Sequence, residues 1–278
     1  MASTQRLNRA ISRRAEVVAD LGKQLIFHGN ALREIPRASV RYRREVIRLL
    51  SEVSFGSGAL AVVGGTIGVM VALSLFTGSV VGLQGYAALD QLGTSALTGF
   101  ISAYFNTREI APLVGSLALA ATVGAGFTAQ LGAMRINEEV DALEVMGVRS
   151  VPYLVSCRVI AGLVAVIPLY AIGLLTSYVG SRLVVVYFQG QSAGTYDHYF
   201  ALFLPPVDVF LSFLKVLGFA IVIILIHCYY GYTASGGPAG VGQAVGRAVR
   251  LSIVAINVLD FFLSLAIWGT TTTVRIAG

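Results

Sequence analysis

Long apolar stretches alternate with short polar ones over most of the chain, whereas the first fifty residues are polar and basic. Five stretches reach the roughly 20 residues that a helix needs to cross a hydrocarbon core of about 30 Å. They cover residues 55–80, 110–131, 151–180, 209–232 and 251–274. A weaker apolar stretch at 92–105 is too short to span, so we expect a surface or re-entrant helix there. The pattern predicts an all-α integral membrane protein with about five transmembrane helices.

The N-terminal segment, residues 1–50, has a different pattern. Apolar residues recur at helical spacing between basic ones, namely Leu7, Ile11, Val18, Leu21 and Leu25. This predicts an amphipathic helix in the headgroup plane, with a disordered basic tail as the alternative. The segment is too long and polar for the start of a signal peptide. We therefore divide the chain into a cytoplasmic or interfacial segment, 1–50, and a membrane domain, 51–278.

Composition and charge support this division. Hydrophobic residues make up 56% of the chain and charged residues 12%, about half the roughly 25% found in soluble domains. The net charge of +6 does not indicate a nucleic-acid partner, because eleven of the 20 Lys and Arg residues precede position 49. With the N-terminus inside, sixteen of the 20 lie on the cytoplasmic side and four outside. We expect a cytoplasmic-membrane protein with its N-terminus in the cytoplasm and its C-terminus in the periplasm.

No pattern for catalysis, metal binding or nucleotide binding is present in the sequence. Cys157 and Cys228 lie in or beside apolar runs, and the three histidines are scattered. The glycine-rich run at 236–242 lacks the lysine and spacing of a phosphate-binding loop, and we interpret it as a flexible cytoplasmic turn. We therefore expect no cofactor in this chain, and any ATP site must lie on another subunit.

The polar loop between the second and third apolar stretches has the pattern of a short helix, at about 135–147. Asn137 is a candidate cap, and Glu138 and Glu139 would occupy the first turn, where the helix dipole favours carboxylates. Gly147 is suited to a left-handed C-terminal residue. A short acidic helix between two spans suggests a docking partner, and a solvated connector is the alternative.

Two ionisable residues lie inside apolar stretches, Lys215 and Asp260. Their depths from opposite ends are roughly 10 and 13 Å, so they are close along the membrane normal. We favour a structural Lys215–Asp260 pair; a lipid-headgroup ligand or a snorkelling lysine are alternatives. Gly64 and Gly68 give the first stretch a small-xxx-small step, typical of helix packing, with a lipid gate as the other reading.

Several of these segments resemble a known family. The run EEVDALEVMG at 138–147, with VPYL at 151–154 and Arg158, resembles the MlaE/YrbE permeases. These are the membrane subunits of ABC-type lipid transporters that work with MCE-domain proteins. Further matches are ATVGAG at 121–126, FLK at 213–215, HCYYG at 227–231, SGG at 235–237, GVG at 240–242, AV at 248–249 and LDFF at 259–262. The loop 190–200 and the HCYY run most resemble the actinobacterial YrbE branch, B-type subunit.

The resemblance implies a transport subunit with no catalytic activity of its own. The family's cytoplasmic helix acts as a coupling helix in a groove of an ATPase, here of MceG type, which holds ATP and Mg. The residues carried over to it are Arg135, Asn137, Glu138, Glu139, Asp141, Glu144 and Gly147. The other implied partners are a second YrbE-type chain, Mce proteins outside and the membrane lipid itself.

The cargo implied is a hydrophobic lipid, such as a fatty acid or sterol, moved as an import across the cell envelope. An ATP-independent secondary transporter is the alternative, although it usually needs more spans and an internal repeat. An intramembrane enzyme would need a paired acid or nucleophile–base set, which Lys215 and Asp260 alone do not supply.

Overall fold

The computed structural model describes residue 19 and residues 22–55 and 65–269, in which every regular element is a helix. The α-helices are α2 (Ile35–Arg41), α3 (Arg43–Phe55), α5 (Thr66–Asp90), α6 (Thr98–Phe105), α7 (Ala111–Leu119), α8 (Ala125–Ile136), α9 (Glu139–Val145), α10 (Cys157–Leu183), α11 (Ala193–Leu202), α12 (Pro206–Tyr232) and α13 (Gly237–Trp268). A 3₁₀ turn and four π-helical segments extend them: η1 (Ser95–Leu97), η2 (Asn106–Ile110), η3 (Ala120–Gly124), η4 (Val151–Ser156) and η5 (Val184–Phe188).

Five continuous helical stretches of the described chain are long and apolar enough to cross a membrane. They are Thr66–Asp90, Ser95–Ile136, Val151–Phe188, Pro206–Tyr232 and Gly237–Trp268. The prediction of an all-α membrane protein with about five spans is therefore confirmed. Most of the amphipathic pattern expected at 7–25 lies outside the described residues.

The second span corrects the prediction for residues 92–105. These residues do not form a separate surface or re-entrant helix, because α6 continues through η2 into α7 and α8 as one 42-residue helix. The polar run NTRE at 106–109 lowers the hydropathy of this stretch, but its side chains find partners in neighbouring helices. Asn106 donates to Ser181 Oγ at 2.8 Å, and Thr107 Oγ1 lies 2.5 Å from Tyr178 Oη.

The first and last spans also differ from the expected boundaries. Phe55 ends α3, and the described part of the first span, Thr66–Asp90, continues ten residues beyond the predicted end at 80. The last span begins at Gly237, so most of the glycine-rich run is helical and is not the flexible turn we expected. Within this run only Gly236 and Gly237 adopt positive φ, and Pro238 follows in the first turn, where its missing N–H has no cost.

Close packing of α5 against α10 holds the first and third spans together. A Cβ on Gly78 would overlap the backbone carbonyl of Ser177, and one on Gly82 would lie 2.8 Å from the carbonyl oxygen of Ser181. The Ser181 hydroxyl donates to Gly78 O across this contact at 2.6 Å. Small residues in α5 therefore let the two backbones approach, as is common in membrane helices. The predicted Gly64–Gly68 step stays a prediction, because Gly64 lies outside the described residues.

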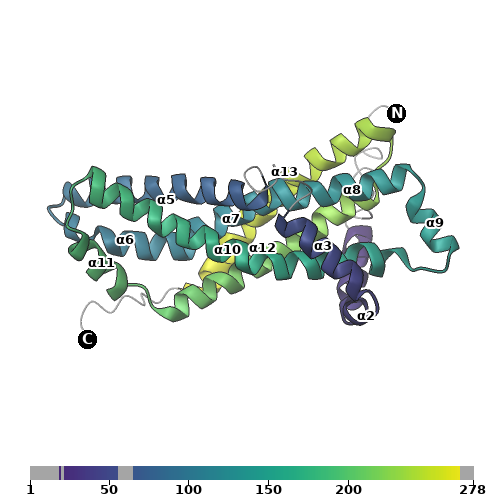
Figure 1. Cartoon of the computed structure of the whole chain (residues 1–278), viewed down its shortest axis with the longest axis horizontal. Coiled ribbons are helices and arrows are strands. Elements are labelled where there is room, and N and C mark those ends of the chain that lie inside the picture. Colours follow the sequence, from purple (N-terminus) through teal and green to yellow (C-terminus); the bar gives the residue numbers. More distant parts are fainter. Residues whose placement is uncertain (1–18, 20–21, 56–64, 270–278) are drawn as a thin grey trace, which may run out of the picture.

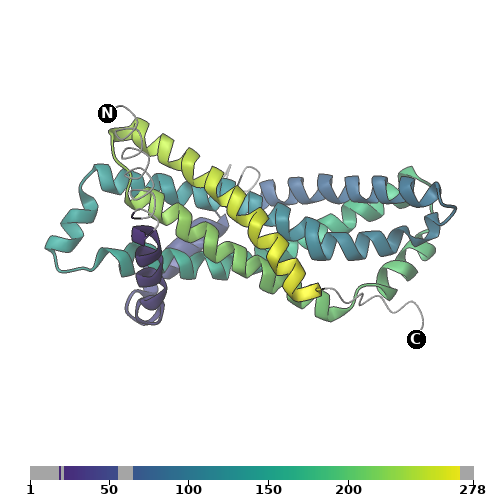
Figure 2. The ribbon, with the colours of Figure 1, turned by 180° about the vertical axis from the view of Figure 1, so that it is seen from behind.

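The helices form an elongated bundle with two distinct ends (Figure 1). The short helix α9 projects from one end, and α11 lies at the other end beside the turn between α5 and α6. Seen from behind, α13 crosses the bundle obliquely (Figure 2). The core includes Met70, Tyr170, Phe219 and Ile223, all almost completely buried.

Candidate functional site

Helix α9 is short because α8 continues almost to its start. α8 ends at Ile136, and Asn137 N donates to Ala133 O as the last bond of that helix. Asn137 therefore does not cap α9, which corrects the sequence expectation, and α9 has seven residues instead of the range 135–147. The corner falls on Glu138, which adopts a left-handed φ of 60° and whose carbonyl accepts the first helical bond from Ala142.

The C-terminal end of α9 is closed by Gly147. It adopts a φ of +76°, and its N–H donates to Glu144 O at 2.9 Å. The next amide, Val148 N, donates to Leu143 O at 2.9 Å. These two bonds form a Schellman motif, in which glycine avoids the cost of a Cβ in the left-handed region. Both ends of α9 are therefore fixed by backbone geometry.

The four carboxylates of α9 fall into two groups. Asp141 accepts a hydrogen bond from Arg135 at 2.5 Å, and Glu144 accepts one from Ser150 Oγ at 2.5 Å. Glu138 and Glu139 are exposed, and their only side-chain hydrogen bond within the described chain is a long one of 3.5 Å from Asn137 to Glu139. We expected all four carboxylates to face a partner. In the structure, Asp141 and Glu144 also stabilise the loop through these hydrogen bonds.

The tip of α9 also exposes apolar surface. Val145 and Met146 are 90% and 69% exposed, whereas Val140 is buried. The outer surface of α9 therefore combines two exposed carboxylates with two exposed apolar side chains. We call Glu138, Glu139, Val145 and Met146 the α9 face.

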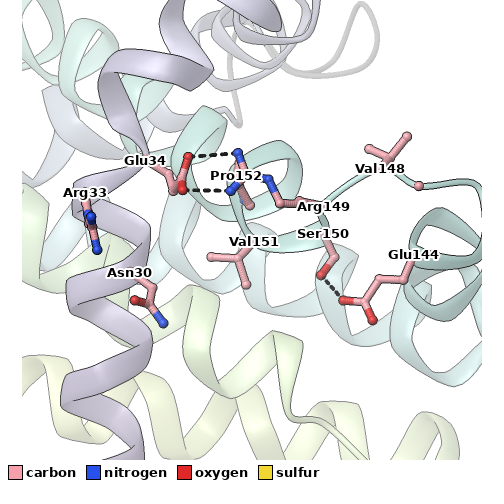
Figure 3. A pocket seen from close by; sticks show the side chains of 10 residues that line it. Asn30, Arg33, Glu34, Glu144, Val148, Arg149, Ser150, Val151 and Pro152 are labelled. Atoms are coloured by element: carbon pink, nitrogen blue, oxygen red, sulfur yellow. Dashed lines mark hydrogen bonds and ion pairs between the residues drawn. The ribbon is translucent and has the colours of Figure 1, made fainter.

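The loop after α9 is tied to the N-terminal segment (Figure 3). Glu34 accepts hydrogen bonds from Arg149 at 2.9 and 3.2 Å and from Arg37 at 3.0 Å, beside a pocket of about 550 Å³. Desolvation acts to raise the pKa of Glu34, but the bonds from the two arginines outweigh it and lower that pKa below its ordinary value. Glu34 therefore remains a carboxylate at neutral pH and joins the two segments.

A second polar cluster lies inside the bundle around Lys215. Lys215 Nζ lies 2.6 Å from Asp260 Oδ1, so the structure brings the two sequence-predicted residues together. The same ammonium contacts Glu109 Oε2 at 3.0 Å, Arg108 O at 2.8 Å and Ser264 Oγ at 2.7 Å. Its side chain is completely buried, which excludes the snorkelling alternative. Because an ammonium has three donors, Lys215 has none left for a lipid headgroup.

The other residues of this cluster were not predicted from the sequence. Arg108 donates through Nε and Nη2 to Asp208 Oδ2 at 2.9 and 2.6 Å, and Trp268 Nε1 donates to Asp208 Oδ1 at 2.9 Å. Arg108 is one of the four positive residues that the charge distribution places outside or at the outer ends of spans. The available signal was the charged pair Arg108–Glu109 between two apolar stretches. The cluster joins the second, fourth and fifth spans, and its geometry fits a structural cross-link.

A metal site has no support in the described part of the chain, where no group of three or more potential ligands was found. The two cysteines, Cys157 and Cys228, are free and buried. The bundle therefore offers two chemically distinctive places, the α9 face and the Lys215 cluster.

Comparison with known proteins identifies the family. The family described as Permease MlaE matches residues 55–266. A probable ABC transporter permease protein of Rickettsia bellii is 31% identical over 252 residues, which cover 91% of this chain and 93% of the relative. The intermembrane phospholipid transport system permease protein MlaE of Haemophilus influenzae is 29% identical over 196 residues, 70% of this chain and 75% of the relative.

A plant protein is also similar. The chloroplastic protein TRIGALACTOSYLDIACYLGLYCEROL 1 of Arabidopsis thaliana is 31% identical over 199 residues, 72% of this chain and 57% of the relative. None of these three relatives is actinobacterial, so the expected YrbE branch stays a prediction. The family match covers four of the five spans completely, together with α9 and most of the fifth span. The chain therefore belongs to the MlaE permease family.

Proposed function

We propose that this chain is a membrane subunit of an ATP-driven lipid transporter, and that a separate ATPase drives it through α9. The observation that carries the proposal is the α9 face. It projects from one end of the bundle (Figure 1). It exposes two carboxylates and two apolar side chains. Carboxylates steer a basic partner and fix its register, and exposed apolar side chains add contact area once docked.

The connections of α9 suit an element that transmits movement from a partner to the membrane spans. α8 leads into it through the Glu138 corner, and the Schellman motif at Gly147 leads out towards η4 and α10. Arg135–Asp141 and Glu144–Ser150 tie the helix to the ends of the two neighbouring spans. A displacement of α9 is therefore transmitted directly to the second and third spans. ATP and Mg would be held by the partner, since this sequence has no phosphate-binding loop.

The cargo we propose is a hydrophobic lipid such as a fatty acid, a sterol or a phospholipid. The Haemophilus relative is named for phospholipid transport. The Lys215 cluster supports an apolar cargo, because its polar groups are used within the chain and do not form an open polar site. We further propose import as the direction of transport, as the sequence resemblance implies.

The partners we propose follow the same resemblance. They are a second YrbE-type permease chain, an MceG-type ATPase on the cytoplasmic side, and MCE-domain proteins outside. If this chain is an actinobacterial B-type subunit, the second permease chain is a different, related protein. This arrangement requires the N-terminus and α9 to lie in the cytoplasm. The excess of Lys and Arg at that end supports this orientation.

A co-purification experiment tests the proposal. The chain is purified in mild detergent from its native host, as the wild type and as Glu138→Lys/Glu139→Lys, followed by mass spectrometry and an ATPase assay. These two side chains have few contacts within the chain, so the reversal changes the docking charge and spares the fold. Asp90→Lys is the matched control, because Asp90 is an exposed carboxylate at the opposite end.

We expect a nucleotide-hydrolysing subunit with the wild type and with Asp90→Lys, and its loss by at least tenfold with the double reversal. If no ATPase accompanies the wild type, the ATP-driven reading fails and an ATP-independent secondary transporter becomes the better explanation. If the ATPase is retained in the double reversal, the transporter reading stands but α9 is not its docking element.

A further inference from the structure

An apolar groove lies on the outside of the bundle between α3, α5 and α10. It measures about 400 Å³, within the range of about 300–1,000 Å³ typical of small-molecule sites. Its walls are almost entirely apolar; they include Ile47, Leu50, Ile67, Val164, Pro168 and Ile172. Ile47 and Val164 are 63% and 47% exposed, so the groove is open to the surroundings of the membrane helices.

A basic hollow of about 410 Å³ lies along the same helix, α3, on the N-terminal side of the groove. Four arginines and one carboxylate line it, and Tyr153 of η4 forms its other side; they are Arg41, Arg43, Arg44, Arg48 and Glu45. Both hollows therefore lie between α3 and the helix that runs from η4 into α10. Arg44 precedes Leu50 by six residues, so the basic and apolar parts are separated by about 9 Å along the helix.

The charge of the basic hollow is not neutralised within the described chain. Arg48 pairs with Glu45 at 2.6 Å and with Glu52 at 3.5 Å. Arg41, Arg43 and Arg44 are exposed, and none of them makes an ion pair with another described residue. Three guanidinium groups are therefore available to an anion.

The direction of α3 matches the polarity of a membrane lipid. α3 runs from α2, in the half of the bundle that carries α9, towards the middle of the bundle (Figure 1). Its basic start is thus closer to the α9 end, and the apolar groove lies deeper. A phospholipid in the leaflet on the α9 side has the same order, with its phosphate outside and its acyl chains inside.

We propose that α3 and α10 form a binding site for one anionic phospholipid of this leaflet. The phosphate contacts Arg41, Arg43 and Arg44, and one acyl chain fills the groove. Charge complementarity favours this occupant over a partner helix, because three exposed arginines lie on the N-terminal side of the groove along the same helical segment. The site is separate from the α9 face and does not depend on the identity of the transported lipid.

Occupation of this site would also affect the bundle mechanically. Glu52 of α3 accepts a hydrogen bond from Gln130 of α8, and Arg158 of α10 donates to the Gln130 oxygen at 3.3 Å. This chain of polar contacts joins α3 to both helices that flank α9. A lipid bound between α3 and α10 therefore stabilises the packing of α3 against α8 and α10.

Native mass spectrometry of the purified chain in detergent tests the proposal. The probes are dioleoyl phosphatidylglycerol and dioleoyl phosphatidylcholine, titrated against the wild type and Arg43→Gln/Arg44→Gln. The matched control is Arg247→Gln/Arg250→Gln, which removes two exposed arginines beside a hollow of α13. Val164→Trp fills the groove and leaves the arginines in place.

We expect one phosphatidylglycerol to bind the wild type and the control at least tenfold more tightly than phosphatidylcholine. Arg43→Gln/Arg44→Gln removes this preference, and Val164→Trp weakens both lipids. Equal losses in the two arginine doubles would indicate non-specific attraction and overturn the proposal. So would unchanged binding in Val164→Trp, or a second protein chain in place of lipid on the wild type. A thermal unfolding curve for each variant separates lost binding from lost folding.

Discussion

Lys215 shows how a single buried charge is tolerated in a membrane span. Its ammonium is completely buried and contacts two carboxylates, a hydroxyl and a backbone carbonyl. Desolvating such a group is costly, and only complete pairing offsets that cost. Removing the cation alone therefore leaves Glu109 and Asp260 facing each other without a counter-ion. Removing one carboxylate as well relieves part of that repulsion.

We predict that Lys215→Met destabilises the protein by about 3–5 kcal/mol, the range for breaking a buried ion pair. Lys215→Met/Asp260→Asn should be more stable than Lys215→Met, although it carries one more substitution. Unfolding can be followed with a thiol-reactive dye, because Cys157 and Cys228 are both buried until the bundle opens. Arg250→Met, an exposed cation, is the control and should be nearly neutral. A double variant less stable than the single would contradict the pairing.

Sequence position identified two of the five ionisable residues of this cluster. Lys215 and Asp260 stand out because each is a charge inside an otherwise apolar run. Arg108 and Asp208 lie 100 residues apart, each at the edge of an apolar stretch, where charges are ordinary. Only the packing of the second span against the fourth and fifth brings them together. Single-sequence patterns contain no information on that contact.

At the scale of elements, the contact between α5 and α10 depends on residues without side chains. Gly78 and Gly82 lie directly against the backbone of α10, so no rearrangement of flexible side chains can make room for a methyl group. The bond from Ser181 Oγ to Gly78 O depends on the same close approach.

We predict that Gly78→Ala separates the first and third spans and lowers the unfolding temperature strongly. Gly246→Ala is the matched control, since a Cβ at Gly246 in α13 would meet no atom within 4 Å. That substitution should be neutral, or stabilising by up to about 1 kcal/mol through helix propensity. The same thiol-reactivity measurement compares the two variants. Equal melting temperatures for Gly78→Ala and Gly246→Ala would refute a close-packed α5–α10 contact.

Hydropathy located the elements and misplaced several of their ends for a common reason. An average over a window treats Asn106, Arg108 and the glycines at 236–242 as breaks. The structure satisfies the polar groups across helices and absorbs the glycines into a helical turn. The corner before α9 shows that residue type alone is also not sufficient. Asparagine is a favourable N-cap residue, but Asn137 ends α8 and does not begin α9. At this position the continuation of the packed helix α8 outweighs the local preference of asparagine for a helix N-cap.

At the scale of the whole molecule, the two ends of the bundle carry different charged residues. The α9 end carries the loop contacts of Glu34 and Arg149 and the arginines of α2 and α3. The α11 end carries Arg182 paired with Asp197 at 2.8 Å. Positive residues concentrate at the α9 end, which favours placing it in the cytoplasm. α9 joins the second and third spans and α11 joins the third and fourth, so the two must face opposite sides of the membrane.

Cysteine labelling in cells tests this orientation directly. The native cysteines are buried, so a single introduced cysteine dominates the reaction with a membrane-impermeant maleimide. We predict that His198→Cys in α11 reacts in intact cells, whereas Glu139→Cys in α9 reacts only after the membrane is opened; both positions are exposed. Labelling of both from outside would contradict the five-span topology. The inverse pattern would place α9 where no ATP is available and would exclude it as the contact for an ATPase.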